Sequence, residues 1–529
     1  MGKLSKLVAG AAICTAGVTA VSFLTTKEQR KHFLYQLADK NINLLLKGLA
    51  SAAPKASWTN DEFDNENFMS GREGYAKRAK KGAKWCLGFD KKSILPDDYK
   101  TKDYYIAGFL SYPPNVMTDV LDDQAVRAVC IDDESGRGKV VFCVIDCVGI
   151  SNTDICKIRE RLRDFAQENN IVSINVSATH CHSCIDTLGM WGDILSKNTI
   201  NNIKAVKNDD KDSLKSGKDP EFIENLIETS ALVIENACNN MVQGDMYMSI
   251  TDKLKYSRDK RPPEVLEKDI VKLRFKPSDG GRETVFVYMA AHPVALGSKN
   301  TVLSGDYPTY IEKEMNENGL NCIFFQGAQL AIAVQRSGIV KDDLSGYEPF
   351  IEYGREIAKH LLSDELKEKK LSPIINIKHK TIRLNCENNL LILAGKLGLI
   401  NNKLIINEDK KEFATEIGIV QLGNKLSVAL IPGEIAPELI LGGFSSKWES
   451  YRKESFNLPP VKEMIKGDTK VIAIVLCNDS AGYILPDNDF GSVVAPLHYE
   501  EVVSPGKNTG SSIIKAFSQL ANEFYSTDC

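Results

Sequence analysis

A near-continuous apolar run, KVVFCVIDCVGI at 139–150, constrains the fold of this chain more than any other segment. A strand that is buried on both faces of a sheet needs such a run, whereas a half-exposed strand alternates apolar and polar residues. The sequence then predicts a helix over 152–169, capped from 151–153, and a strand over 173–178. Strand, helix and strand in this order predict a βαβ unit of an α/β fold.

The rest of the chain continues this alternation of apolar strands and amphipathic helices. A more β-rich excursion is expected at 374–408, and a hairpin at 418–434. Further strands are predicted near 246–256, 270–275, 283–290, 322–328 and 471–478, and helices at 221–243, 309–317, 347–363, 436–441 and 510–524.

The first hundred residues differ from the rest in composition. Lys3 and Lys6 precede an uncharged, mostly apolar stretch at 7–24, which is typical of a secretory signal or a single membrane anchor. A buried helix is the alternative. We expect a signal or anchor at 1–26, a polar helical linker or cap at 27–100, and the main domain at 101–529, outside the cytoplasm.

Charge and cysteine content exclude some classes of protein. The formal net charge is −4, and no basic stripe with interleaved aromatics is present, so the sequence does not predict a nucleic-acid partner. The number of cysteines is odd, at thirteen, and several lie inside apolar runs. They are predicted to be buried thiols instead of a disulfide framework.

Four of the apolar strands end at side chains that are able to bind a metal ion. His180 and His182 follow one strand, and His292, Glu434 and Tyr483 follow three others. Strand ends on one edge of a sheet converge in space. Two imidazoles, a carboxylate and a phenolate, with water in the remaining position, would suit zinc.

Spacing alone does not select this set, and each member has a structural alternative. His292 precedes Pro293 and would serve as a turn residue, Glu434 as a carboxylate at a helix N-terminus, and Tyr483 as a core aromatic. Cys181 and Cys184 form half of a zinc knuckle, but no second pair follows.

Four segments, in this order along the chain, resemble the neutral, non-lysosomal ceramidase family. A further similarity runs from Tyr104 to Asp146, so the resemblance spans roughly 103–505. The four segments are SATHCHSCIDTLGMWGD (177–193), AAHPVALGSKNTVLSGDYPTYIEKEM (290–315), IPGEIAPELILGG (431–443) and NDSAGYILP (478–486).

The resemblance implies a large, mixed-sheet α/β catalytic domain of a zinc-dependent amidase that cleaves the N-acyl bond of a sphingoid lipid. It implies that His182 either supports the metal ligands or transfers a proton, and that Arg258 lies near the substrate carbonyl, although Arg261 is three residues away. The zinc ligands that it implies are His180, His292, Glu434 and Tyr483.

The chain also departs from the family pattern. The Gly-Asp-Val-Ser-Pro-Asn stretch, whose serine takes part in catalysis in the family, is replaced here by QGAQLAIA at 326–333. Cys184 and Ile185 stand where the family has glycine and proline. No room is expected for the C-terminal immunoglobulin-like domain of longer members.

The sequence therefore predicts a zinc-dependent hydrolase of an amide, most simply a ceramide-like lipid. Such a reaction would use metal-activated water with His182 as the base, and this route needs no serine. Membrane association is expected through the N-terminal segment or the substrate. Two alternatives remain open: a hydrolase of another amide or ester, and a non-catalytic, envelope-associated binding protein with a degenerate site. The acyl chain and the oligomeric state are not predicted.

Overall fold

The larger of two sheets contains nine strands and is mixed, because the outermost pair at each edge is parallel and the pairs between them are antiparallel. The computed structural model describes residues 27–52, 67–109, 111, 113–192, 199–208, 210, 213–400, 404–406, 411–491 and 498–526. In order, the strands are β11 (Asn321–Gln326), β9 (Thr284–Met289), β8 (Ile270–Pro277), β6 (Val242–Thr251), β1 (Trp85–Ser93), β3 (Ala125–Asp132), β4 (Lys139–Ile145) and β5 (Ile171–Ala178), with β13 (Lys369–Leu371) beside β6.

The second sheet has five strands and packs face to face against the first. Its strands are β14 (Ile375–Asn385), β16 (Lys411–Leu422), β17 (Leu426–Leu430) and β19 (Lys470–Ile474), with β15 (Ile405–Ile406) beside β16. The predicted β-rich excursion at 374–408 is therefore part of a main sheet, since β14 pairs with β16 along its whole length.

Side-chain alternation along the strands builds the core on both faces of the large sheet. On β9, Phe286 and Tyr288 point into the layer between the two sheets, where they join Val428 and Ile472 of the second sheet. Val285 and its alternate neighbours on β9 point the other way, toward helices. All of these residues are buried, as the uninterrupted apolar runs predicted.

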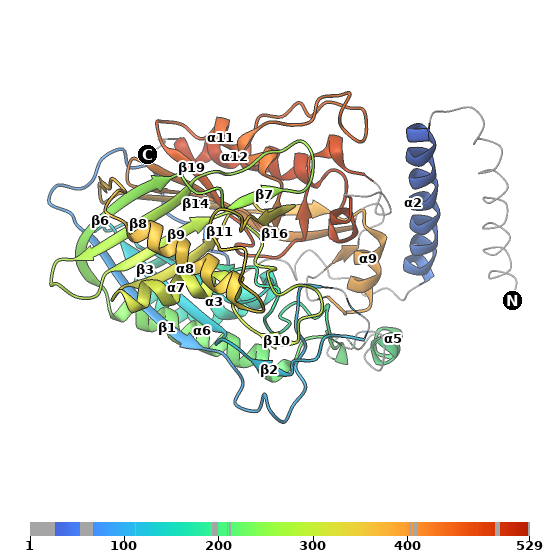
Figure 1. The fold of residues 1–529 in the computed structure, drawn as a ribbon, viewed down its shortest axis with the longest axis horizontal. Helices are drawn as coiled ribbons and strands as arrows, with labels where there is room; N and C mark the ends of the chain where they lie inside the picture. The colour runs from blue at the N-terminus through green and yellow to red at the C-terminus, as the bar shows by residue number, and fades with distance from the viewer. Residues whose placement is uncertain are drawn as a thin grey trace, which may run out of the picture.

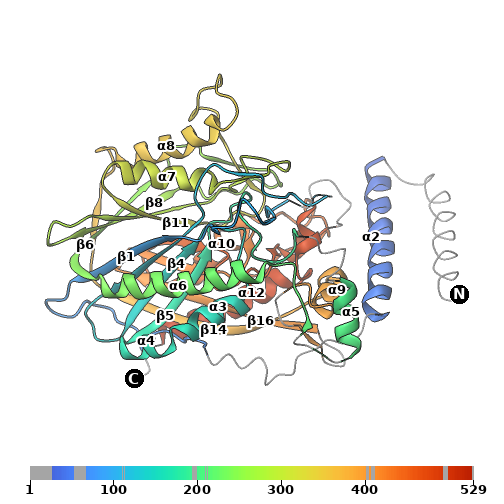
Figure 2. The same ribbon diagram turned by 90° about the horizontal axis from the view of Figure 1, so that it is seen from below.

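Helices cover the outer faces of both sheets, which gives four layers (Figures 1 and 2). In Figure 1, α12 lies along the upper side of the molecule and α6 along the lower side, with the sheets between them. On the large sheet lie α3 (Asn152–Arg161), α4 (Arg163–Glu168), α6 (Pro220–Asn239), α7 (Asp306–Glu317) and α8 (Glu348–Leu362), and α12 (Thr509–Tyr525) covers the second sheet.

Shorter elements complete the described chain. They comprise α2 (Lys27–Ala52), α5 (Thr199–Lys207), α9 (Asn389–Lys396), α10 (Pro437–Leu441), α11 (Val461–Met464), 3₁₀ turns at Asp487–Asp489 and Glu500–Val503, and the two-stranded pairs β2 (Asp119–Val120) with β10 (Val302–Leu303), β7 (Ser257–Asp259) with β12 (Ile332–Val334), and β18 (Glu434–Ile435) with β20 (Tyr483–Ile484).

The βαβ unit forms as the sequence predicted. Parallel strands β4 and β5 are joined by α3 and α4, and the side chain of Ser151 caps α3 by accepting a hydrogen bond from the Asp154 amide. The boundary that we expected at residue 100 lies too late. Strand β1 pairs with both β3 and β6 in the middle of the large sheet, so the main body includes Trp85.

The predicted signal or anchor at 1–26 lies outside the described residues. None of the helices in the described part of the chain combines the length and apolar composition that crossing a bilayer requires.

The two edges of the large sheet approach each other, and a segment that follows β19 joins them. The Val475 amide donates to the Gln326 carbonyl at the end of β11 (3.0 Å), and the Asn478 amide donates to the Val176 carbonyl of β5 (2.8 Å). Strand ends that are far apart in the order of the sheet therefore meet in space. This closure brings the predicted site residues together.

Candidate metal centre

The loop after β5 turns two imidazoles into one cavity. His180 adopts a left-handed backbone conformation (φ 63°), so the chain has left the strand before the His-x-His pair. The His182 amide donates to the Pro293 carbonyl (3.1 Å), which ties this loop to the loop after β9. Gly108 packs on the His182 ring, since a Cβ at Gly108 would lie 2.4 Å from the ring's Cγ and Nδ1 atoms.

The cysteines of the same loop point away from the cavity. The thiol of Cys181 donates to the Ser304 carbonyl (2.9 Å), and the Cys184 thiol approaches the same oxygen at 3.6 Å. Both side chains are buried, and burial raises the pKa of each thiol. Neither lines the cavity, so the geometry favours histidine over cysteine as a ligand.

His292 is held by the segment that replaces the family's serine stretch. Its amide and its Nδ1 atom both lie against the Ile332 carbonyl, at 2.9 and 3.1 Å. Glu434 and Tyr483 lie side by side because β18 and β20 are parallel and pair these two residues in register. All three side chains are buried and line the same cavity as His180 and His182.

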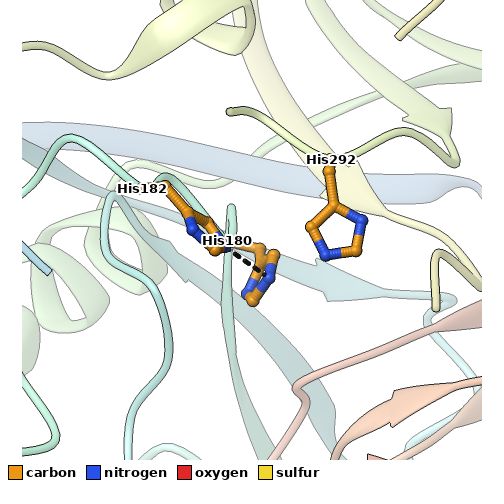
Figure 3. Close-up of side chains that lie close together, drawn as sticks. All are labelled: His180, His182 and His292. Carbon is orange, nitrogen blue, oxygen red and sulfur yellow. Dashed lines mark hydrogen bonds between the residues drawn. The ribbon is translucent and has the colours of Figure 1, made fainter. Parts of the chain in front are cut away.

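One oxygen of Glu434 lies between two imidazoles. The Oε2 atom is 3.1 Å from His180 Nε2 and 3.0 Å from His292 Nε2. His182 Nε2 lies 2.9 Å from His180 Nε2, as the dashed line in Figure 3 shows, and His292 faces this pair from another strand end. The three histidines bring ligand nitrogens within 4.8 Å of one another.

Hydrogen bonds to the backbone fix which nitrogen carries the proton in two of the three imidazoles, His180 and His292. His180 Nδ1 lies 2.7 Å from the Val148 carbonyl, and His292 Nδ1 lies against that of Ile332. A carbonyl only accepts, so each Nδ1 must donate, and a neutral ring then presents a lone pair at Nε2. These lone pairs face a carboxylate oxygen of Glu434, which is also an acceptor.

Either a proton on an Nε2 atom or a metal cation at the point where these atoms converge resolves this clash of acceptors. Two ligands about 2.0 Å from a tetrahedral zinc ion lie about 3.3 Å apart, close to the separations seen here. Metal-binding histidines commonly donate their other nitrogen to a backbone carbonyl, as His180 and His292 do. The residues present therefore fit zinc.

Burial and mutual contact set the protonation of the site. Burial, followed by the neighbouring His180 and His292, lowers the pKa of His182, and burial also lowers that of His292, so both rings are neutral at pH 7. Burial alone would raise the pKa of Glu434, but His180 and His292 outweigh it and lower the pKa. Burial, then Glu434, raises the pKa of Tyr483.

The centre lies in a cavity of about 520 Å³ with both polar and apolar lining residues. The polar lining, which we call the polar end, includes the five predicted residues. The apolar lining, which we call the apolar lobe, includes Leu188, Met190, Trp191, Cys386, Leu391, Ile400, Leu404, Phe413, Val502 and Val503. Its volume is that of a small-molecule site, and its lining suits a hydrocarbon chain.

The arginine that we predicted near the substrate does not line this cavity. Arg258 is exposed on β7, and Arg261 is buried in ion pairs with carboxylates such as Glu500 and Glu501. Lys260 lines the cavity instead. Sequence reasoning missed Lys260 because the register of a short strand decides which of several neighbouring cations faces inward.

The segment that replaces the family's serine stretch fills space. Leu330 and Ala331 pack in the hydrophobic core, Gln329 is fully buried, and none of these side chains lines the cavity. The apolar lobe was also missed, although its clearest signal is the apolar run LLILAGKLGLI at 390–400.

Fold and site together define an α/β protein with a buried histidine and carboxylate centre in a cavity of about 520 Å³. No family model matches the chain, and no curated protein matches it. Among solved structures, it is similar to neutral ceramidase from Pseudomonas aeruginosa, with a TM-score of 0.61 and 14% identity over 83% of this chain and 74% of that one. A second structure, of a ceramidase complexed with C2, matches at a TM-score of 0.61 and 14% identity, over 84% and 76%. The chain has a neutral-ceramidase-like fold.

Proposed function

We propose that this protein is a zinc-dependent hydrolase of an amide bond, with an N-acyl sphingoid (ceramide-like) lipid as substrate. The observation that carries the proposal is the convergence of His180 Nε2, His292 Nε2 and Glu434 Oε2 at 3.0–3.1 Å, with both Nδ1 atoms against carbonyls. His180, His292, Glu434 and Tyr483 would hold the ion. Zinc in such a site polarises a carbonyl and lowers the pKa of a water to about 7.

The other residues at the polar end have separate tasks in this proposal. His182 is neutral at pH 7 and adjacent to His180, so it is placed to accept a proton from the attacking water. Lys260 replaces Arg258 as the cation that stabilises negative charge developing on the substrate carbonyl. Neither task needs the serine that the chain lacks.

The apolar lobe supports a lipid-like substrate. Leu391 lies on α9, and Ile400 and Leu404 follow it. Their apolar side chains line the cavity. An acyl chain there would gain roughly 0.8 kcal/mol for each methylene group that it buries. A purely polar amide would gain nothing from this lining.

Metal analysis tests the centre. After zinc-supplemented folding the protein should contain about one zinc per chain, and His292→Ala should reduce this to less than about a tenth and abolish turnover. The matched control is His360→Ala, because His360 is half-buried on α8, bonds to Thr251 at the end of β6, and does not line the cavity. Zinc retained in His292→Ala would refute its role as a ligand.

A substrate panel with two leucine variants tests the reaction. N-acyl sphingoids of increasing acyl length should be cleaved faster than N-acyl amino acids and simple esters. Leu391→Trp should shift the preference toward short acyl chains by about tenfold, whereas Leu390→Trp, next to it but exposed, should not. Bound zinc without turnover of any of these compounds would favour a non-catalytic binding protein.

A further inference from the structure

Helix α2 carries an unusual number of exposed apolar side chains. Ile42, Leu44, Leu45 and Leu49 fall within eight residues and are exposed by 39, 64, 48 and 50%. Single exposed leucines are ordinary on a protein surface, but a contiguous group indicates a surface that meets an apolar partner.

Two neighbouring helices extend this group. Leu390 at the start of α9 and Ile200 on α5 are exposed by 38 and 58%. Figures 1 and 2 both show α2, α9 and α5 at the same end of the molecule, with α2 outermost. Six of the eleven large apolar side chains that are exposed in the described part of the chain thus lie at one end, which we call the α2 end.

Helix α2 is attached to the body along one side. It packs against α9, and its described side chains include only one that is buried, Ala50. The Nζ atom of Lys396, at the end of α9, donates to the Ala50 carbonyl (2.7 Å) and so fixes the last turn of α2. Leu44, Leu45 and Leu49 remain open to a partner.

The apolar lobe of the cavity lies directly behind the α2 end. Leu391 of α9 lines the cavity, whereas its neighbour Leu390 is exposed on the surface. Ile400 and Leu404, which follow α9, line the same lobe. A single short helix therefore separates an apolar surface from an apolar interior.

The charge of this region favours a lipid bilayer over a protein as the partner. The sequence of α2 contains five basic and two acidic residues, and α5 ends with Lys204 and Lys207. Leucines beside basic residues are typical of helices that lie in the interface of an anionic membrane. The residues that precede α2 include the uncharged apolar stretch 7–24.

We infer that the α2 end docks on the surface of an anionic lipid bilayer and places α9 and the apolar lobe next to the acyl chains. The leucines of α2 enter the boundary between headgroups and acyl chains, while its lysines contact lipid phosphates. Docking itself is independent of the reaction. Delivery of a substrate's acyl chain past α9 rests on the proposed function.

Vesicle binding of the full chain tests the docking. Leu44→Glu, Leu45→Glu and Leu49→Glu combined should weaken partitioning onto phosphatidylcholine vesicles containing phosphatidylserine by at least about tenfold. The matched control combines Leu232→Glu, Ile250→Glu and Tyr347→Glu, which change other exposed apolar residues away from α2, α5 and α9. Circular dichroism and thermal unfolding confirm that both variants fold.

Hydrogen exchange separates the α2 end from the residues before it. Vesicles should slow amide exchange in α2 of the wild-type protein and leave α6 unchanged. Slowed exchange confined to 1–26, or a triple α2 variant that binds vesicles as the wild type does, would overturn the inference. A third outcome is that the triple variant binds vesicles as the wild type does but no longer self-associates in sedimentation experiments. This result would show that α2 contacts a second copy of the chain instead of a membrane.

Turnover separates this inference from the proposed function. The triple α2 variant should hydrolyse a soluble short-chain N-acyl amide at the wild-type rate and lose turnover of the same amide embedded in vesicles. If neither the wild type nor the variant hydrolysed the soluble or the embedded amide, the proposed function would be overturned. The docking inference would stand or fall separately, on the vesicle-binding experiment. Equal loss on soluble and embedded substrate would contradict a docking role.

Discussion

The loops after β5 and after β11 end on the same site but contribute to it in different ways. The first, 179–187, directs the imidazoles of His180 and His182 into the cavity. The second loop, 327–334, directs no side chain into the cavity. It contributes the Ile332 carbonyl, which holds His292. One loop supplies side chains to the cavity and the other supplies backbone support, so the proposed metal centre does not depend on the side chains of 327–334.

The sharpest way to test this comparison is to remove the proposed base while leaving the proposed ligands. His182→Asn should lower kcat by about 10²- to 10⁴-fold, the usual contribution of a general base, and leave about one zinc per chain. His360→Asn, away from the cavity, is the control. If zinc were lost from His182→Asn, the ligands would be His180, His182 and His292, which also lie close enough together.

A change in the second loop should affect stability and metal affinity more than chemistry. Ala331 is buried and has a left-handed backbone (φ 62°), which a β-branched residue disfavours. Ala331→Val should reduce the free energy of unfolding by about 3 kcal/mol and weaken zinc binding by about tenfold, because the Ile332 carbonyl moves.

Ala331→Gly is the matched control, since glycine accepts the same backbone conformation without strain. Its free energy of unfolding in urea should lie within about 1 kcal/mol of the wild type. Equal stability of the valine and glycine variants would show that the second loop is not a rigid support.

Much of this arrangement could be predicted from local patterns. Hydrophobic periodicity and helix caps predict the buried run at 139–150, the βαβ unit and the C-terminal helix. The apolar runs also predict the strands that end at His180, His182 and His292. The ligand roles of these residues stay predictions. The left-handed turn at His180 could not be predicted, because a non-glycine residue adopts it only under tertiary constraint.

Features that depend on distant segments were not predictable. Closure of the large sheet by 475–478 rests on hydrogen bonds between residues about 150 to 300 positions apart. The choice of Lys260 over Arg258 depends on how β7 pairs with β12. The apolar lobe is formed by α9 and the segments near it, and these come together only when the second sheet has packed.

The pH dependence of stability tests the packing behind the second loop, and its effect is the smallest. Glu438 lies beside Leu330 and Ala331, and burial raises its pKa to about 8. The native state therefore keeps a proton that the unfolded chain releases near its ordinary pKa of about 4.3, so stability falls as the pH rises between these values.

Replacing Glu438 with glutamine removes this titration while keeping the shape of the side chain. Glu438→Gln should match the wild type within about 0.5 kcal/mol at pH 5 and exceed its free energy of unfolding by about 1–2 kcal/mol at pH 8. Glu348→Gln, exposed on α8, is the control and should leave the pH dependence unchanged. All three proteins keep the residues of the candidate metal centre. If Glu438→Gln showed the same pH dependence of stability as the wild type, the titrating group would be a residue other than Glu438. The carboxyl of Glu438 would then have no effect on the packing of the second loop.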